Sequence, residues 1–132
     1  MTFETTIDVR YRDIDAMGHV NNAVYASYLE QARIDYFQHL LGVDLSSVGV
    51  VLASLSIDYE RPIELPDGPV RVELDVPRIG DSSIPMEYEL YRADGELVAT
   101  GETVQVAFDK EAQKPTSIPE PWREAITEFH DL

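Results

Sequence analysis

The sequence contains no cysteine, only two lysines and no long apolar run. Without cysteine the chain can form no disulfide, no thiolate zinc site and no cysteine nucleophile, which fits a reducing compartment such as the cytoplasm. No apolar stretch approaches the roughly 18–20 residues that a membrane-spanning helix needs. Residues 1–20 lack a basic segment followed by an apolar block, so we expect no secretory signal and a cytoplasmic protein.

Positive charge is scarce throughout the chain. There are 25 acidic and 10 basic residues, and the formal net charge is -15. Nucleic-acid binding requires a basic surface, and anionic lipid repels an acidic one, so we expect neither nucleic acid nor membrane as a partner. The acids are scattered among apolar residues rather than gathered in a tail. Two interpretations stay open: an ordinary acidic protein, or one adapted to high salt, which screens like charges.

The length and the hydrophobic content fit a single folded domain. The chain has 132 residues, of which 44% are hydrophobic, enough for one packed core. We therefore expect one domain over residues 1–132, with a short proline-rich tail from about residue 110. A last short helix is predicted inside this tail, over residues 122–130.

Alternating apolar and polar residues predict strands near the N-terminus and in the second half of the chain. Residues 2–12 alternate with a period of two, and so do several segments between residues 50 and 109 that are separated by turn signals. In the last of these segments, three residues are expected to face the core: Val104, Val106 and Phe108.

Between these strands the spacing of apolar residues changes to that of a helix. From about residue 22 to residue 41 they fall three or four positions apart and so occupy one face. An asparagine at position 21 or 22 can cap the helix, and Gly42 can end it. The predicted order is β-α-β-β-β-β, an α+β fold in which a mostly antiparallel sheet covers one long helix.

The turn before this helix holds an unusual set of polar residues. It contains Asp13, Asp15, Gly18, His19 and an Asn-Asn pair. The first N–H groups of a helix have no intrahelical partner and favour negative charge. A carboxylate a few residues upstream can lie beside them, which would combine a base or nucleophile with an oxyanion site. The alternative is that Asp15 is an ordinary turn residue, since aspartate is common in turns.

This turn, together with the order of elements, resembles the hotdog-fold acyl-CoA thioesterases of the 4-hydroxybenzoyl-CoA thioesterase-like group. The signature of the group is an aspartate followed by x-x-Gly-x-Val and then a helix with aromatic residues and an arginine. Six residues meet it: Asp15, Gly18, Val20, Tyr25, Tyr28 and Arg33. The resemblance in element order extends over about residues 3–108. It implies a sheet wrapped around one long helix, and a homodimer at minimum or a tetramer, because two chains pair to form the active sites in this group.

Carried onto this sequence, the catalytic carboxylate of the group falls on Asp15, and its oxyanion-binding backbone N–H falls on Asn22. The resemblance implies hydrolysis of an acyl-CoA thioester to a free acid and coenzyme A, with Asp15 as nucleophile or general base. We also assign Gly18, His19 and Tyr25 to the substrate site. The position of Asn22 is aromatic in some members, so the acyl pocket should differ here. No cofactor is expected, since coenzyme A is part of the substrate, and Asp13 is expected to be a loop acid.

The phosphates of coenzyme A need positive charge, and four arginines on or beside the predicted strands are candidates: Arg61, Arg71, Arg78 and Arg92. Each can equally be a solvated surface residue. We assign Arg61 to substrate binding, and backbone N–H groups are an alternative for the phosphates. No metal site is expected, because the three histidines lie far apart in the sequence.

Two other functions stay open. A noncatalytic hotdog module would bind acyl-CoA without turnover, although the presence of Asp15 favours an enzyme. The dehydratase branch of the fold carries Phe-Pro-Gly after its histidine, whereas His19 is followed by Val-Asn-Asn, which disfavours that branch. His19 is either a base or a structural hydrogen-bonding residue. The sequence indicates neither the acyl group nor its carrier, coenzyme A or acyl carrier protein.

Overall fold

The computed structural model describes residues 1–43 and 49–132 of the chain, and its order of elements confirms the prediction. The strands are β1 (Phe3–Ile7), β2 (Val50–Tyr59), β3 (Val70–Asp75), β4 (Ser83–Tyr91), β5 (Leu97–Asp109) and the short β6 (Lys114–Pro115). The helices are α1 (Val24–Tyr36) and α2 (Glu120–His130). Short helical turns complete the list: η1 (Tyr11–Asp13), η2 (Phe37–Leu41) and η3 (Leu65–Asp67).

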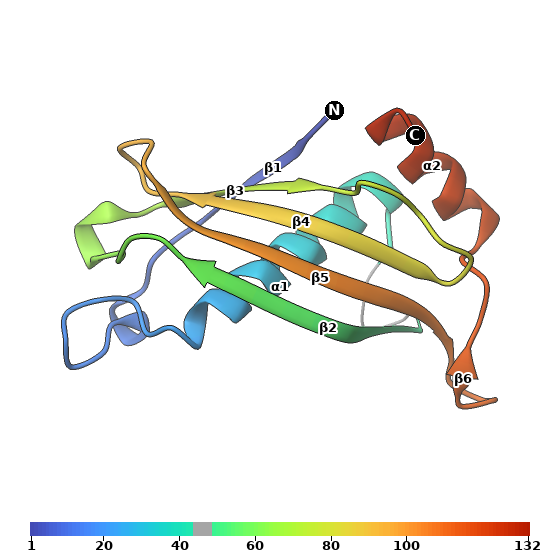
Figure 1. The fold of residues 1–132 in the computed structure, drawn as a ribbon, viewed down its shortest axis with the longest axis horizontal. Helices are drawn as coiled ribbons and strands as arrows, with labels where there is room; N and C mark the ends of the chain where they lie inside the picture. Colours follow the sequence, from blue (N-terminus) through green and yellow to red (C-terminus); the bar gives the residue numbers. More distant parts are fainter. Residues whose placement is uncertain (44–48) are drawn as a thin grey trace.

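The strands form one antiparallel sheet in the order β1-β3-β4-β5-β2, and β6 pairs with β5. The sheet curls over α1, which crosses one of its faces, while α2 packs near the N-terminus (Figure 1). Trp122 of α2 contacts Phe37 at a ring distance of 5.9 Å, which joins α2 to the end of the long helix. This is the predicted hotdog arrangement. No helix in the described part of the chain is long and apolar enough to cross a membrane.

The long helix follows its predicted pattern. Tyr25, Leu29, Ala32 and Tyr36 are all buried against the sheet. The helical path continues through η2 and ends at Gly42, whose φ of 67° is the left-handed value that glycine adopts easily. The start differs from the prediction. Residues 22 and 23 form a turn, and the Asn21 side chain accepts the N–H of Ala23 at 2.9 Å, so it supports this turn rather than capping α1.

The first strand is shorter than predicted, ending at Ile7 instead of residue 12. Its ladder with β3 stops at the pair Ile7–Val70. The next partner would be Pro69, which has no N–H to donate to a ladder. The chain then enters the turn η1, where Tyr11 is 84% exposed.

The prediction for the core face of β5 was wrong. Val104, Val106 and Phe108 are only partly buried, whereas Thr103, Gln105 and Ala107, in the opposite phase, are buried. The side of β5 that faces the helix is fixed at Gly101, where α1 comes so close that an added Cβ would lie 3.0 Å from Leu29 Cδ1. Side chains in phase with Gly101 face the helix. The two polar ones are accommodated because Thr103 Oγ1 lies 2.6 Å from the Tyr88 hydroxyl and Gln105 Nε2 donates to the Ile84 carbonyl at 2.9 Å.

The edge strand β2 carries an apolar stripe on the side that faces α1. A bulge between Leu52 and Ser54 shifts the alternation by one residue. As a result Leu52 lies opposite Gln105 while Leu55 lies opposite Thr103, so both leucines share the helix side of the sheet. They stay 46% and 41% exposed, because β2 lies at the edge of the sheet, beyond the part that α1 covers.

Candidate active site

A cavity of about 650 Å³ lies where the start of α1 meets the end of β2. Three pieces of chain line it: the turn before α1, the first turn of the helix, and the residues around the end of β2. The lining residues are Asp15, Met17, His19, Val20, Asn21, Asn22, Tyr25, Tyr59, Glu60, Arg61 and Pro62. Among the predicted site residues, five therefore share one cavity, and Gly18 lies just outside its wall.

Asp15 is positioned by a tight local turn. Its N–H donates to the His19 carbonyl at 2.9 Å, and its carbonyl accepts the N–H of Gly18 at 3.0 Å. Gly18 has a φ of +81°, so a residue with a side chain would be strained at this position. Asp15 Oδ1 accepts the N–H of Met17 at 2.9 Å. Oδ2 has no hydrogen-bond partner among residues 1–43 and 49–132, so half of this partly buried carboxylate is free for chemistry.

The backbone of Asn22 offers a free donor to the same cavity. The neighbouring N–H groups of Ala23 and Val24 donate to the side chain and the carbonyl of Asn21, each at 2.9 Å. The N–H of Asn22 itself has no acceptor within the described residues. Its carbonyl is held by the Tyr59 hydroxyl, which donates to it at 2.9 Å. A fixed backbone N–H that lacks a partner is the kind of donor that an oxyanion site requires.

Two tyrosines form the wall between the helix and β2. The rings of Tyr25 and Tyr59 meet edge to face at a centroid distance of 4.9 Å. Burial, and then the neighbouring Tyr59, raises the pKa of Tyr25, so its hydroxyl stays protonated at neutral pH. Sequence reasoning missed Tyr59 as a site residue. The available signal was its place at the end of an apolar strand, two residues before Arg61.

The turn is also tied to the segment that follows β2. Val20 donates its N–H to the Ile63 carbonyl at 2.7 Å. His19 Nε2 lies 3.9 Å from Glu64 Oε1, an exposed contact across the same junction. These contacts hold the turn with Asp15 beside the end of β2, so the cavity is built from segments about forty residues apart in the sequence.

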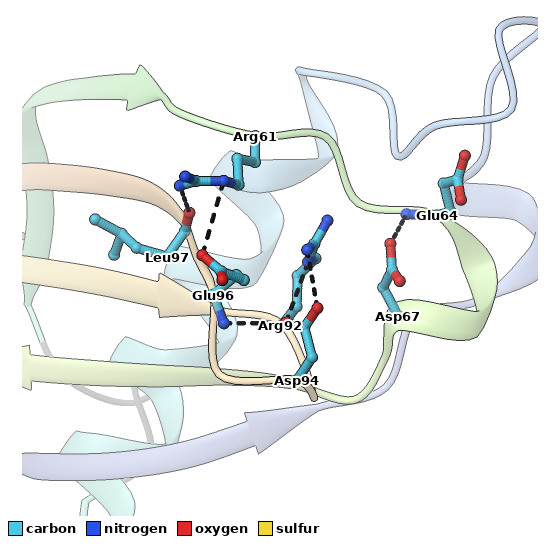
Figure 2. A network of polar contacts seen from close by, with 7 residues as sticks. All are labelled: Arg61, Glu64, Asp67, Arg92, Asp94, Glu96 and Leu97. Atoms are coloured by element: carbon cyan, nitrogen blue, oxygen red, sulfur yellow. Dashed lines mark hydrogen bonds and ion pairs between the residues drawn. The ribbon is translucent and has the colours of Figure 1, made fainter.

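Arg61 lines the cavity, but its guanidinium is already engaged. Figure 2 shows it turned toward the neighbouring hairpin, where Nη1 donates to the Leu97 carbonyl at 3.3 Å and Nε lies 3.8 Å from Glu96 Oε2. Its positive charge is therefore partly offset by Glu96. A coenzyme A phosphate can bind the Arg61 guanidinium only by competing with the Glu96 carboxylate.

The other arginine candidates do not line this cavity. Arg71 pairs with Glu73, and its guanidinium lies over the Tyr91 ring, with Cζ 4.3 Å from the ring centroid. Arg92 Nη2 donates to Asp94 at 2.9 Å in the turn drawn in Figure 2. Arg78 lies exposed in the loop after β3. For these three, the surface interpretation fits the structure better than phosphate binding at the cavity.

Asp13 lies in the turn η1 between β1 and α1, where a loop acid was predicted, but it is buried rather than solvated. It is only 8% exposed, and its Oδ2 accepts the Tyr28 hydroxyl and the N–H of Arg10, each at 2.9 Å. Burial, and then this hydrogen bond, raises the pKa of Tyr28. Asp13 thus fastens η1 to α1. No group of three or more histidine, aspartate or glutamate side chains in the described ranges is placed to hold a metal ion.

A curled antiparallel sheet around one long helix is the architecture of the hotdog-fold thioesterases. Comparisons with known proteins agree. The model of the thioesterase-like superfamily matches residues 9–126. A thioesterase from Thermus thermophilus, solved with coenzyme A and zinc, has a TM-score of 0.87 and 40% identity over 98% of this chain and 94% of its own.

Two relatives extend the comparison. The long-chain acyl-CoA thioesterase FadM of Escherichia coli (strain K12) is 27% identical over 130 residues, which cover 96% of this chain and 98% of FadM. The uncharacterized protein YsmA of Bacillus subtilis (strain 168) is 30% identical over 126 residues, covering 95% of this chain and 85% of YsmA. The chain belongs to the thioesterase-like superfamily.

Proposed function

We propose that Asp15 and the backbone N–H of Asn22 carry out the hydrolysis of an acyl-CoA thioester by this thioesterase. The observation that supports the proposal is that both line one cavity, with a free carboxylate oxygen on one and an unpartnered donor on the other. The thioester carbonyl would accept the N–H of Asn22 at the helix start, where the helix dipole favours the developing oxyanion.

Two routes use the same geometry. In the first, Asp15 attacks the carbonyl carbon, the thiolate of coenzyme A leaves, and water then hydrolyses the mixed anhydride. In the second, Asp15 takes a proton from a water molecule that attacks the carbonyl directly. A single turnover in isotopically labelled water tests the first route. If water attacks the aspartyl carbon of the anhydride, the label enters the Asp15 carboxylate and the first acid product is unlabelled. Attack at the acyl carbon, like the second route, labels the product and leaves Asp15 unlabelled.

The test is an Asp15→Asn variant assayed for free thiol release from a panel of aromatic, short-chain and long-chain acyl-CoAs. We expect kcat to fall by about 10² to 10⁴, the range that a positioned base contributes. Asp8→Asn, at an exposed position after β1, is the matched control and should retain activity. Full activity in Asp15→Asn would remove this residue from the mechanism. No turnover by the wild type, with coenzyme A still raising Tm, would indicate a binding module.

The same proposal includes the acyl carrier, the residues that contact the substrate and the cellular compartment. FadM is named as a long-chain acyl-CoA thioesterase, and we expect coenzyme A, held partly by Arg61, as the carrier here too. His19 and Tyr25 line the cavity and are expected to contact the substrate, while Gly18 shapes the turn. The cytoplasmic location stays a prediction.

We also propose a homodimer that forms through β2. Within the described sheet this strand pairs only with β5, so its other edge has unpaired backbone groups. Four of its apolar side chains are exposed: Val51, Leu52, Leu55 and Tyr59. A second copy at this edge would cover them and complete the cavity beside Tyr59. Analytical ultracentrifugation should give a dimer or a tetramer, and a monomer at micromolar concentration would contradict the proposal.

A further inference from the structure

Among the almost completely buried tyrosines in the described part of the chain, one has a hydroxyl without a partner. Four tyrosines are 4% exposed or less: Tyr25, Tyr28, Tyr36 and Tyr88. Three of their hydroxyls have a partner, at 2.6–2.9 Å: Asp13 for Tyr28, His130 for Tyr36 and Thr103 for Tyr88. The Tyr25 hydroxyl has no hydrogen-bond partner among residues 1–43 and 49–132. Tyr25 is also the only one of the four that lines the candidate active-site cavity.

The Tyr25 hydroxyl is not sealed inside the protein. In the described ranges, the side-chain atom that is fully enclosed and lacks a partner is Gln105 Oε1, so the Tyr25 oxygen keeps some accessible surface. Side chains on a helix lean toward its N-terminus, and Tyr25 lies three residues after Asn22. Its ring therefore extends back toward the turn that carries the Asn22 N–H. The Tyr59 ring packs against it at 4.9 Å, and the Tyr59 hydroxyl donates to the Asn22 carbonyl at 2.9 Å.

Packing alone does not explain a hydroxyl at this position. A phenylalanine would fill nearly the same volume and keep the edge-to-face contact with Tyr59. Buried tyrosine hydroxyls usually find a partner, as the other three do here, because a donor without an acceptor costs free energy. In the free protein, water in the cavity can accept this hydrogen bond. A donor that opens into a catalytic cavity without a protein acceptor indicates that the substrate supplies the acceptor.

We propose that the Tyr25 hydroxyl is a second donor to the thioester carbonyl, beside the N–H of Asn22, and so a catalytic residue. The position of the carbonyl rests on the proposed function. When the nucleophile adds to the carbonyl carbon, the electron pair of the C=O bond moves onto the oxygen, and it returns when the carbon–sulfur bond breaks and the thiolate leaves. Two donors stabilise that charge during the step. Tyr25 keeps its own proton throughout, because burial raises the pKa of its hydroxyl.

The kinetic test is Tyr25→Phe with octanoyl-CoA, whose acyl group has the carbonyl as its only oxygen. We expect kcat to fall by about 10²-fold or more, as for loss of one oxyanion donor. The KM should change by less than about threefold, because the bond is strongest in the transition state. Tyr36→Phe is the matched control. It removes the same atom from a buried tyrosine about 16 Å farther along the helical path, outside the cavity, and should retain kcat.

Thermal unfolding of the same two variants separates catalysis from packing. Tyr36→Phe should lower Tm by about 2–8 °C, because it leaves the buried His130 without its partner. Tyr25→Phe breaks no hydrogen bond within the described chain and should leave Tm unchanged. An unchanged kcat in Tyr25→Phe would overturn the proposal. A higher KM at unchanged kcat, or a fall in Tm as large as that of Tyr36→Phe, would do the same.

Two ligands that cannot be hydrolysed test the donor without turnover. In 2-oxononyl-CoA a methylene separates the sulfur from the carbonyl, and nonyl-CoA is the matched thioether without the carbonyl. By calorimetry the wild type should bind the ketone more tightly, and Tyr25→Phe should reduce this preference by about threefold or more. No preference in the wild type, or an equal one in Tyr25→Phe, would overturn the proposal. If Asp15→Asn retains full hydrolysis, or the wild type hydrolyses no thioester, while Tyr25→Phe still loses the preference, the proposed function fails and the Tyr25 donor stands.

Discussion

On the outer face of the sheet, acidic side chains of neighbouring strands lie directly opposite each other. This arrangement predicts that removing one of the charges raises the free energy of unfolding. In the strand register, Glu87 of β4 lies opposite Glu102 of β5, and Asp75 of β3 lies on the other side of Glu87. Both glutamates are exposed. Like charges directly opposite each other on a sheet are destabilising. Neutralising Glu102 should therefore stabilise the fold.

The size of the effect follows from the spacing. Side chains directly opposite on antiparallel strands have Cβ atoms about 5 Å apart, so two carboxylates at about 6 Å repel by about 0.7 kcal/mol in bulk water. We expect Glu102→Gln to raise the free energy of unfolding by about 0.5–1 kcal/mol at low ionic strength. In 1 M salt the screening length falls to about 3 Å, and the gain should nearly vanish.

Urea unfolding at low and at molar salt provides the measurement. Glu111→Gln is the matched control, since this exposed residue lies beside Lys110 in a turn and has no acid across a ladder. The double variant Glu87→Gln/Glu102→Gln should gain less than the sum of the single variants, because the two charges act on each other. A loss of stability in Glu102→Gln at low salt, or a gain that persists in molar salt, would refute the reasoning. Under the salt-adaptation hypothesis, the wild type itself should be more stable in molar salt.

Three further predictions follow from other parts of the fold. Burial lowers the pKa of His130 below its ordinary value of 6.5, so the unfolded state takes up a proton at a higher pH than the folded state does. The free energy of unfolding should therefore have its full value above pH 6.5 and fall as the pH drops below it. A His130→Asn variant should show a shallower fall. Gly101→Ala should cost about 1–3 kcal/mol, because its Cβ would press on Leu29, and an unchanged urea midpoint would contradict this contact. Tyr59→Phe should lower kcat/KM about tenfold with little change in Tm, because the Asn22 carbonyl loses the hydroxyl that holds it; unchanged kinetics would show that this bond does not position the site.

Local chemistry explains what could be predicted from the sequence. The turn at Asp15 depends on hydrogen bonds within four residues, and the left-handed values at Gly18 and Gly42 depend on the absence of a side chain. The buried face of α1 follows from a spacing of three and four residues. For these parts a short stretch of chain carries all the interactions that matter, so a pattern in the sequence is enough to predict element type and the position of the candidate carboxylate.

What only the tertiary structure decided involves contacts between distant segments. The sequence pattern suggested that Val104 faces the core, but close approach of α1 at Gly101 turned the opposite set of β5 side chains inward. Tyr59 joins the cavity only because β2 ends beside the start of α1. Arg33 is a charged residue of the predicted helix, and its burial, with 6% of the residue exposed, appears only once the sheet has closed over it. The reason is the same in each case: a local pattern sets which side chains share a face, whereas packing against another element sets what that face meets.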